Sequence, residues 1–400
     1  MVSVDLDRLS KYLTITDNAR FLLEHCEKKT MFTLTVRTSE DKILAADVFV
    51  VYHNTARGPA KGGIRLSPHV TLDETTDLAE RMTWKTALVK LPFGGGKSGI
   101  VINPSALSLF ERINIFHEYV HIMQWELLSG AYVPAPDLGS GPQDMAIIYG
   151  ETHHLESVTG KPPRVGGLPG RLEATGRGVA HVTRLALNEF LRKHVEGATV
   201  AVQGFGNVGS WTAKFLADWG AKVVAVSDVA GGVYDTKSID VDALRAIASR
   251  HGEIKDGPGE KITNKELLAL KVDCLIPAAV ENVLTAETAP KVRASLIVEG
   301  ANGPTTAEAD DILAEKGVKV VPDILANSGG VIASYIEWRK AKSGSITGRD
   351  EVFQAIEELI GETFKEICGI AGEKRASHRT AAQIAAVGEV VQAMHDRGWL

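Results

Sequence analysis

Cysteine is scarce in this chain, which has only Cys26, Cys274 and Cys368 among 400 residues. Three scattered thiols favour neither a disulfide framework nor a thiolate metal site. Long apolar runs are also missing, because none approaches the roughly 20 residues needed to cross a bilayer. The stretch MVSVDLDRLSKYL has no basic region before an apolar core, so a secretory signal is not expected. These absences favour a soluble, cytoplasmic protein that does not act at a membrane.

An excess of positive charge is absent as well. The chain has 44 Lys and Arg residues against 50 Asp and Glu residues, and its formal net charge of −6 gives no general attraction for nucleic acid. Hydrophobic residues make up 44% and charged residues 24% of the sequence, as in ordinary globular proteins. A chain of this length exceeds one core and is expected to form two or three domains.

The hydrophobic pattern changes near residue 175. Before it, residues 34–54 alternate as strands do, and helices are predicted over residues 72–90 and 108–128. After it, a helix to about residue 193 precedes short apolar runs that alternate with helices. These runs cover residues 198–205, 221–228, 272–279, 295–302 and 318–325. The second pattern is typical of a parallel sheet covered on both faces, so the expected fold class is α/β.

A dinucleotide fingerprint lies at the start of the second pattern. The stretch GFGNVG follows the apolar run TVAVQ and opens a predicted helix that ends at Gly220. Its glycines are expected to make the turn, to let backbone N–H groups reach a pyrophosphate, and to let helix and strand pack closely. The predicted cofactor-binding residues here are Gly204, Phe205, Gly206, Asn207, Val208 and Gly209.

Asp228 ends the next apolar run, 24 positions after Gly204. A carboxylate there would accept hydrogen bonds from the adenosine ribose and repel a 2′-phosphate, so the sequence favours NAD over NADP. Lys237 follows closely enough to leave NADP, or use of both cofactors, open. The motifs AAVENV, GANGPTT and ANSGG each follow a later strand and are expected at the same carboxyl edge of the sheet.

The stretch LPFGGGKSG ends as a phosphate-binding P-loop does. That loop needs a glycine six positions before its lysine, where this chain has Leu91, so nucleotide hydrolysis is not inferred. Lys97 is instead predicted to lie in a glycine-rich turn with another role.

Lys61, in RGPAKGGIR, and Lys85, in MTWKTA, have surroundings similar to those of Lys97. Asp137, in PAPDLGSG, is a candidate carboxylate partner. If the three lysines converge, repulsion and partial burial would lower at least one lysine pKa towards neutrality. Such an amine can act as a base or stabilise developing negative charge.

With these motifs assembled, the chain resembles the glutamate, leucine, phenylalanine and valine dehydrogenase family, most closely its glutamate-specific members. The motifs stand in the family's order and spacing over nearly the whole chain. They are RGPAKGGIR, MTWKTALVKLPFGGGKSGI, PAPDLGSG, RLEATGRGV, GFGNVG, PAAVENV, EGANGPTT and PDILANSGGV. The resemblance implies a substrate-binding and oligomerisation domain at 1–176, with 375–400 packing back on it, a Rossmann-type, doubly wound dinucleotide-binding domain at 177–374, and a homohexamer.

The resemblance also implies site residues. Lys97 matches the catalytic lysine, Asp137 the proton-transferring carboxylate, and Lys85 the lysine that binds the substrate α-carboxylate. Lys61 and Ser334 match the pair that holds the glutamate side-chain carboxylate. Burying the Lys61 ammonium against an apolar substrate side chain would be costly, so Lys61 also favours an acidic substrate. The substrate residues implied are Lys61, Met82, Lys85 and Ser334, and the cofactor residues beyond the fingerprint are Thr175, Asp228, Ala279, Asn302 and Asn327.

The implied reaction is the NAD(P)-dependent oxidative deamination of L-glutamate and its reverse. Hydride leaves the α-carbon for the nicotinamide, Lys97 assists attack of water on the resulting imine, and Asp137 shuttles protons. Ammonia leaves and 2-oxoglutarate is formed. The implied partners are therefore small molecules, without nucleic acid or a metal.

Other readings compete with this one. HEYVH, residues 117–121, fits the zinc-hydrolase pattern, but that pattern is weakly specific and no paired third-ligand motif follows. A catalytically silent NAD-binding paralogue would lack the Lys97 and Asp137 pair. A leucine, phenylalanine or valine-type enzyme is the nearest alternative, against which Lys61 and Ser334 argue.

The chain departs from the family pattern in three places. Ser98 stands where glycine is usual, and Leu168 and Pro169 stand where a Ser-Leu pair is usual. After IEW the chain continues with RKAKSG, where an uncharged continuation is more usual. These departures leave rate, cofactor detail and fine specificity open.

Overall fold

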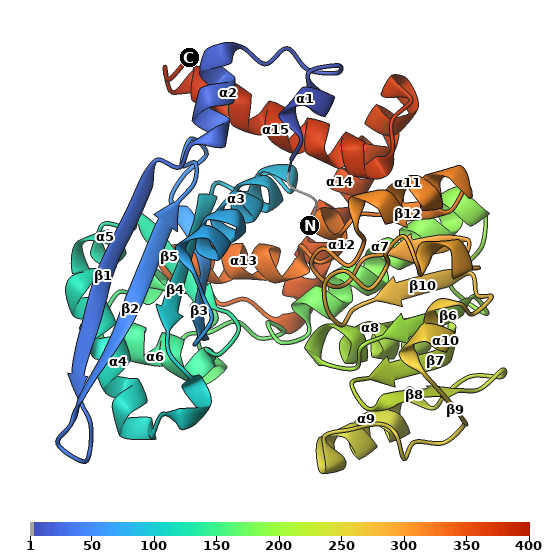
Figure 1. The fold of residues 1–400 in the computed structure, drawn as a ribbon, viewed down its shortest axis with the longest axis horizontal. Coiled ribbons are helices and arrows are strands. Elements are labelled where there is room, and N and C mark those ends of the chain that lie inside the picture. Colours follow the sequence, from blue (N-terminus) through green and yellow to red (C-terminus); the bar gives the residue numbers. More distant parts are fainter. Residues whose placement is uncertain (1–3) are drawn as a thin grey trace. The chain divides into compact units, whose positions relative to one another are not determined.

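The computed structural model describes residues 4–400, which fall into two compact units (Figure 1). One unit contains Asp5–Arg171, Val331–Val352 and Gln383–Leu400. The other contains Leu172–Gly330 and Phe353–Ala382. We call them the N-terminal unit and the nucleotide unit. In the part of the chain that is described, no helix is long and apolar enough to cross a membrane.

The N-terminal unit is built on a five-stranded mixed sheet of order β1-β2-β4-β3-β5. The strands are β1 Lys28–Arg37, β2 Ile43–Tyr52, β3 Ala60–Ser67, β4 Gly94–Val101 and β5 Tyr132–Pro136. β1, β2 and β4 pair antiparallel, whereas β3 pairs parallel with both β4 and β5. The first helices are α1 Leu6–Leu9, α2 Asp17–Glu24, α3 Leu72–Leu88, α4 Leu109–Ile122, α5 Gln124–Leu128 and α6 Pro142–Thr152.

Helices cover both faces of this sheet. On one face α3 begins at the N-cap Thr71, whose side chain accepts from the Glu74 backbone N–H. On the other face α4 begins with a capping box formed by Ser108 and Glu111, and it packs into the main apolar core. The predicted helix over 108–128 is therefore two helices, separated at Met123.

The predicted glycine-rich turn around Lys97 is wrong, because these residues form strand β4 in the middle of the sheet. A Cβ on Gly95 would collide with the Thr83 side chain of α3, and one on Gly99 would collide with Val70 and Thr75. Glycine is needed here because the helix lies too close to the strand for any side chain. The same close packing brings Lys97 under α3.

The nucleotide unit contains a seven-stranded sheet of order β12-β11-β10-β6-β7-β8-β9. Its strands are β6 Thr199–Gln203, β7 Lys222–Asp228, β8 Gly231–Tyr234, β9 Glu260–Ile262, β10 Cys274–Pro277, β11 Leu296–Val298 and β12 Lys319–Val321. The five predicted apolar runs form its five parallel strands, which confirms the α/β fold class. The run at 318–325 ends early, because Pro322 is followed by helix α12, Asp323–Ala326.

Two strands of this sheet have no counterpart in the sequence prediction. β8 pairs antiparallel with β7, and β9 pairs antiparallel with β8. The short runs GGVY and EKI contain too few apolar residues to stand out by periodicity. The remaining helices are α7 Ala174–Leu191, α8 Asn207–Asp218, α9 Val241–His251, α10 Asn264–Leu268, α11 Ala307–Glu315, α13 Gly329–Ser343, α14 Arg349–Lys374 and α15 His378–Asp396.

The chain passes between the units three times after residue 330. Residues 331–352 belong to the N-terminal unit, although the sequence pattern places them in the second domain. Their contacts explain this: Trp338 packs edge-on against Phe93 at 5.1 Å, and Glu337 forms a buried ion pair with Lys161 at 2.7 Å. These partners lie more than 170 residues away in the sequence, so local pattern does not reveal them.

Candidate functional site

Lys97 and Asp137 form an ion pair in the N-terminal unit. Lys97 lies on the face of β4 that α3 covers, and Asp137 directly follows β5, from which β4 is separated by β3. Lys97 is only 5% exposed. A glycine at position 63 makes this approach possible, because a Cβ on Gly63 would collide with the Asp137 side chain. The two residues predicted as the catalytic pair are thus in direct contact.

Arg65 is a second cation on Asp137 and was not predicted from the sequence. Its Nε donates to Asp137 Oδ1 at 2.9 Å, and its Nη1 lies 2.5 Å from Glu74 Oε1. Burial alone would raise the pKa of Asp137, but the charges of Lys97 and Arg65 outweigh it and lower the pKa to about 2. Strand alternation could have revealed Arg65, since it shares a face of β3 with Lys61.

Lys61 is the most deeply buried of the predicted lysines, with 1% of its surface exposed. Its Nζ lies 3.5 Å from the Pro134 carbonyl oxygen. Burial, together with the positive charge of Arg171, lowers the pKa of Lys61 to about 7, although the carboxylate of Glu337 opposes the shift. The expectation that one lysine titrates near neutrality therefore applies to Lys61.

The surroundings of Lys61 hold more cations than anions. Arg171 has a buried Nε without a hydrogen-bond partner among residues 4–400. Glu337 is fully buried, and its carboxylate already binds Lys161 Nζ at 2.7 Å and the Gly160 backbone N–H at 2.9 Å. An orphaned guanidinium nitrogen beside a buried ammonium is a place where an anionic ligand group would be stabilised.

The other predicted substrate residues lie in the same unit. Lys85 and Met82 are half-buried on α3, which also packs over Lys97. Ser334 is 3% exposed on α13, one turn before Glu337. The structure therefore gathers all predicted catalytic and substrate-binding residues in the N-terminal unit.

The fingerprint glycines form a tight turn between β6 and α8 in the nucleotide unit. Gly204 has φ 96°, and a Cβ there would lie 2.7 Å from the Ala278 carbonyl oxygen. A Cβ on Gly209 would collide with the Gly204 carbonyl oxygen, so neither position tolerates a side chain. Gly206 is the exposed N-cap of α8, with open space where a Cβ would stand. This turn and helix terminus fit a dinucleotide pyrophosphate.

The remaining predicted cofactor residues lie at several strand ends of the same unit. Asp228 ends β7, and its two carboxylate oxygens accept from the backbone N–H groups of Ala230 at 2.8 Å and Ile254 at 2.7 Å. Asn327 donates to Asn302 Oδ1 at 2.9 Å. Ala279 is exposed just past β10, and Thr175 is half-buried in the first turn of α7.

Comparison with known proteins places this pair of sites in a family. The sequence profile described as Glutamate/Leucine/Phenylalanine/Valine dehydrogenase matches residues 166–398. The profile described as Glu/Leu/Phe/Val dehydrogenase, dimerisation domain, matches residues 26–154. The chain belongs to the glutamate/leucine/phenylalanine/valine dehydrogenase family.

Two curated relatives cover almost the whole chain. A protein of Saccharolobus shibatae named NADP-specific glutamate dehydrogenase is 44% identical over 387 residues, which are 94% of this chain and 91% of that protein. A protein of Thermotoga maritima named glutamate dehydrogenase is 41% identical over 409 residues, covering 100% of this chain and 97% of the relative.

Solved structures agree with this membership. The hetero-hexameric glutamate dehydrogenase of Thermus thermophilus in its Leu-bound form superposes with a TM-score of 0.91 at 32% identity, over 98% of this chain and 95% of that one. The glutamate dehydrogenase of Peptoniphilus asaccharolyticus superposes with a TM-score of 0.88 at 33% identity, over 99% and 98% of the two chains.

Ser98, a departure from the usual family glycine, lies on the opposite face of β4 from Lys97. Its hydroxyl is fully buried and lies 2.9 Å from both Tyr119 Oη and Tyr132 Oη. Ser98 therefore joins α4 to β5 through two tyrosines in the core of this family member. Its side chain does not reach the Lys97 side of the sheet.

The HEYVH histidines lie on α4. His117 Nε2 lies 3.2 Å from Glu151 Oε1, and both side chains are more than 40% exposed. Within residues 4–400, no group of three or more His, Cys, Asp or Glu side chains is arranged to hold a metal ion. His117 of the motif thus makes a surface contact with Glu151 on α6.

Proposed function

We propose that this chain catalyses the NAD(P)-dependent oxidative deamination of L-glutamate to 2-oxoglutarate and ammonia, and the reverse reductive amination. The observation that carries the proposal is the buried Lys61 ammonium beside Arg171, whose buried Nε has no hydrogen-bond partner within residues 4–400. A substrate with a second carboxylate would offset that charge, whereas an apolar side chain would leave it stranded. The names of the curated relatives support the same substrate.

The proposed chemistry divides between the two units. The N-terminal unit binds the amino acid and the nucleotide unit binds the cofactor, which supplies or accepts the hydride when bound. We assign the α-carboxylate to Lys85 beside Met82, and the side-chain carboxylate to Lys61 and Ser334. Lys97 assists the attack of water on the imine carbon, and Asp137 receives and returns the proton.

The ion pair of Lys97 and Asp137 bears on the order of these steps. A carboxylate with a pKa of about 2 is a weak base while two cations hold it. When Lys97 turns towards the substrate, Asp137 keeps only Arg65, and its pKa rises. We therefore infer that Asp137 takes up a proton only after Lys97 has engaged the substrate.

We propose NAD as the preferred cofactor, with NADP use to be tested beside it. Asp228 stands at the end of β7, where a carboxylate disfavours a 2′-phosphate. The pyrophosphate would be held by the fingerprint glycines Gly204, Gly206 and Gly209. The turn is completed by Phe205, Asn207 and Val208. The nicotinamide side of the cofactor site would be lined by Thr175, Ala279, Asn302 and Asn327.

We also propose a homohexamer, because a related structure is hetero-hexameric and one profile is described as a dimerisation domain. β1 is an edge strand of 10 residues, and Met31 on it is 62% exposed. Trp125 on α5 is 71% exposed. Apolar groups of this size at a sheet edge are typical of subunit interfaces.

The deciding experiment is reductive amination of 2-oxoglutarate, 2-oxoisocaproate and phenylpyruvate, each with NADH and with NADPH. We expect turnover of 2-oxoglutarate to exceed that of both monocarboxylates, with a lower KM for NADH than for NADPH. If the protein turns over 2-oxoisocaproate but not 2-oxoglutarate, the substrate assignment is overturned.

A further inference from the structure

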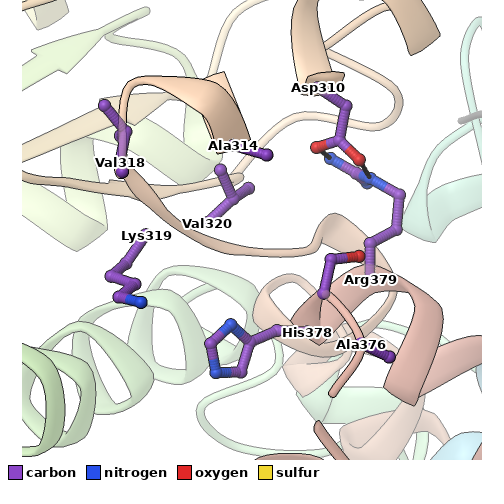
Figure 2. A pocket seen from close by; sticks show the side chains of 10 residues that line it. Asp310, Ala314, Val318, Lys319, Val320, Ala376, His378 and Arg379 are labelled. Atoms are coloured by element: carbon purple, nitrogen blue, oxygen red, sulfur yellow. Dashed lines mark hydrogen bonds and ion pairs between the residues drawn. The ribbon is translucent and has the colours of Figure 1, made fainter. Parts of the chain in front are cut away.

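Arg379 stands between a small surface cavity and a buried cluster of carboxylates in the nucleotide unit. The cavity has a volume of about 170 Å³, and Arg379, Asp310, Lys319 and His378 are among the residues that line it (Figure 2). Arg379 itself is 8% exposed and is the second residue of α15. Its guanidinium therefore faces shallow solvent on one side and closed protein on the other.

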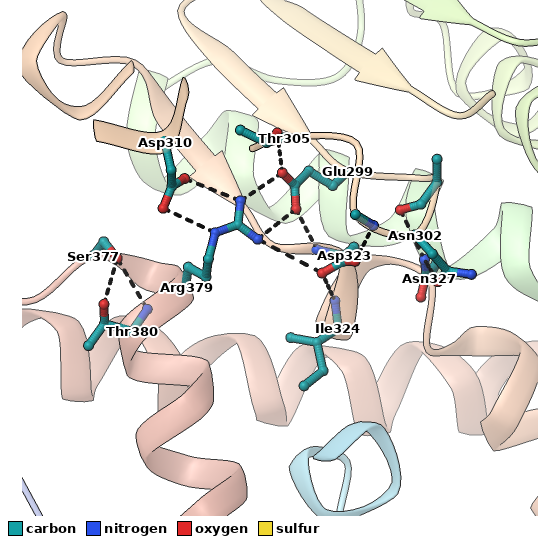
Figure 3. Close-up of polar contacts among 12 residues, drawn as sticks. Glu299, Asn302, Thr305, Asp310, Asp323, Ile324, Asn327, Ser377, Arg379 and Thr380 are labelled. Atoms are coloured by element: carbon teal, nitrogen blue, oxygen red, sulfur yellow. Dashed lines mark hydrogen bonds and ion pairs between the residues drawn. The ribbon is translucent and has the colours of Figure 1, made fainter. Parts of the chain in front are cut away.

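On the closed side Arg379 binds Glu299 through two hydrogen bonds. Its Nη1 donates to Oε2 at 3.0 Å and its Nη2 donates to Oε1 at 2.7 Å. The same guanidinium reaches Asp310 from Nε at 3.1 Å, and its Nη1 lies 3.9 Å from Asp323 Oδ1 (Figure 3). One arginine thus faces three carboxylates, two of which, Glu299 and Asp323, are fully buried.

The two buried carboxylates hold the loop 300–305 in place. Glu299 Oε1 accepts from the Thr305 hydroxyl at 2.5 Å, and Glu299 Oε2 accepts from the Asp323 backbone N–H at 2.9 Å. Asp323 Oδ2 accepts from the Gly303 backbone N–H at 2.7 Å. The base of the loop is therefore fastened to the carboxyl ends of β11 and β12.

The tip of the same loop carries Asn302, which is exposed. Asn327 fastens the loop from its other side, by donating to Asn302 Oδ1 at 2.9 Å and to the Gly300 and Ala301 carbonyl oxygens at 3.3 Å each (Figure 3). Two sets of contacts, one from Asn327 and one from the carboxylates, thus set where Asn302 stands.

Without Arg379 the carboxylates would destabilise one another. Burial raises the pKa of Glu299, the charge of Asp323 raises it further, and Arg379 is the cation that opposes both. Removing a cation from a buried ion pair leaves uncompensated charge, which costs more than the pair itself contributed. Glu299 would then protonate or move, and the loop that it holds would shift.

We propose that Arg379 is a positioning residue for cofactor binding, which acts through Glu299 and Asp323 on the loop that carries Asn302. The proposal rests on the proposed function, because it takes Asn302 and Asn327 as part of the cofactor cleft. The arginine does not itself touch the cofactor. It links the start of the last helix to the nicotinamide side of the site.

The test compares Arg379→Met and Arg379→Lys with the wild type by NADH fluorescence titration and by the KM values for NADH and 2-oxoglutarate. We expect Arg379→Met to raise the NADH Kd about tenfold or more, the scale of one lost charge-assisted hydrogen bond. The NADH Kd of Arg379→Lys should lie between those of the wild type and Arg379→Met, because lysine keeps the charge but cannot bind Glu299 through two nitrogens. The KM for 2-oxoglutarate should stay within twofold, about the error of such comparisons.

The matched control is Arg112→Met, which breaks a comparable pair in the N-terminal unit. Arg112 binds the buried Asp144 through two hydrogen bonds of 2.6 Å. Both methionine variants should lower Tm, but only Arg379→Met should weaken NADH binding. A second control is the double variant Glu299→Gln/Arg379→Met, which also removes the uncompensated charge of Glu299. Compared with Arg379→Met alone, it should recover part of the NADH affinity and of the Tm.

The outcomes separate this inference from the proposed function. If the wild type binds neither NADH nor NADPH, the proposed function fails and the inference fails with it. If the wild type binds NADH and folded Arg379→Met or Arg379→Lys binds it equally well, only the inference is overturned. Equal losses of NADH and 2-oxoglutarate affinity would also overturn it, since they would indicate a general structural defect.

Discussion

Lys97 and Lys61 share one sheet face but differ in their nearest charges. Lys97 is paired with Asp137, which Arg65 also holds. Lys61 has a backbone carbonyl as its hydrogen-bond partner, and Arg171 adds repulsion. The first arrangement holds Lys97 beside the carboxylate that is proposed to exchange protons, and the second suits a group that awaits an anionic ligand.

At the residue scale, Lys97→Ala should reduce kcat about a hundredfold to ten-thousandfold, the range that a general acid–base group contributes. NADH binding should stay near normal, because the nicotinamide and adenosine contacts are assigned to the nucleotide unit. Lys42→Ala is the control, since Lys42 has a side chain 73% exposed beside Glu40. Loss of NADH affinity in Lys97→Ala would show that this lysine serves the cofactor instead.

The pH dependence of substrate binding follows from Lys61. Its pKa is lowered to about 7, chiefly by burial, so the ammonium is present below pH 7 and is lost above it. We expect the KM for 2-oxoglutarate to rise above pH 7, by up to about tenfold per pH unit. The KM for 2-oxobutyrate, which lacks the second carboxylate, should stay flat over the same range. Parallel rises of both KM values would contradict the assignment of Lys61.

At the scale of elements, the close packing of α3 on β4 positions Lys97, the proposed catalytic lysine. Thr83 and Ala79 of the helix lie against the backbone of Gly95. Because no side chain separates helix from strand, Lys97 can reach along the sheet face towards Asp137. The glycines of GGGKSG thus serve the packing of strand β4 and do not form a phosphate-binding turn.

Gly95→Ala should lower the free energy of unfolding by about 1–3 kcal/mol, the usual cost of overpacking a core. Gly150→Ala in α6 is the matched control, because no atom lies within 4 Å of a Cβ at that helical position. The control should be neutral or stabilising by up to about 1 kcal/mol. Urea unfolding of both variants measures the difference, and equal stabilities would refute the packing argument.

At the scale of the whole molecule, the chain returns to the N-terminal unit after forming the nucleotide sheet. Residues 331–352 bring Ser334 and Glu337 to the unit that holds Lys61, and residues 383–400 follow. The proposed substrate residues therefore come from both halves of the sequence. A fragment that stops before residue 331 would lack part of the proposed pocket.

Assembly is also a property of the whole molecule, and Met31→Lys tests it. A charge on the exposed edge strand β1 should shift the proposed hexamer to smaller species in light scattering coupled to size-exclusion chromatography. Val229→Lys is the control, because Val229 is 95% exposed in the nucleotide unit and should leave the mass unchanged. A hexameric Met31→Lys protein would place the interface elsewhere.

Local chemistry explains what could be predicted from the sequence. Five parallel strands, the helix starts predicted near residues 72 and 108, and the turn at Gly204 depend on neighbours within a few residues and are found where the pattern places them. The strand β4 was misjudged because three glycines in a row indicate a turn unless a helix packs on them. Arg65 was missed because its role depends on Asp137, 72 positions away.

The sequence by itself determined the family, the α/β class and the identity of the candidate lysines and carboxylates, since motifs of adjacent residues carry that information. Only the tertiary structure decided that Lys61 is buried beside Arg171, that Ser98 points into the core away from Lys97, and that Arg379 holds the loop of Asn302 through Glu299. Burial and charge compensation are set by residues far apart in the chain. Their energies arise only when folding brings those residues together and removes the water between them.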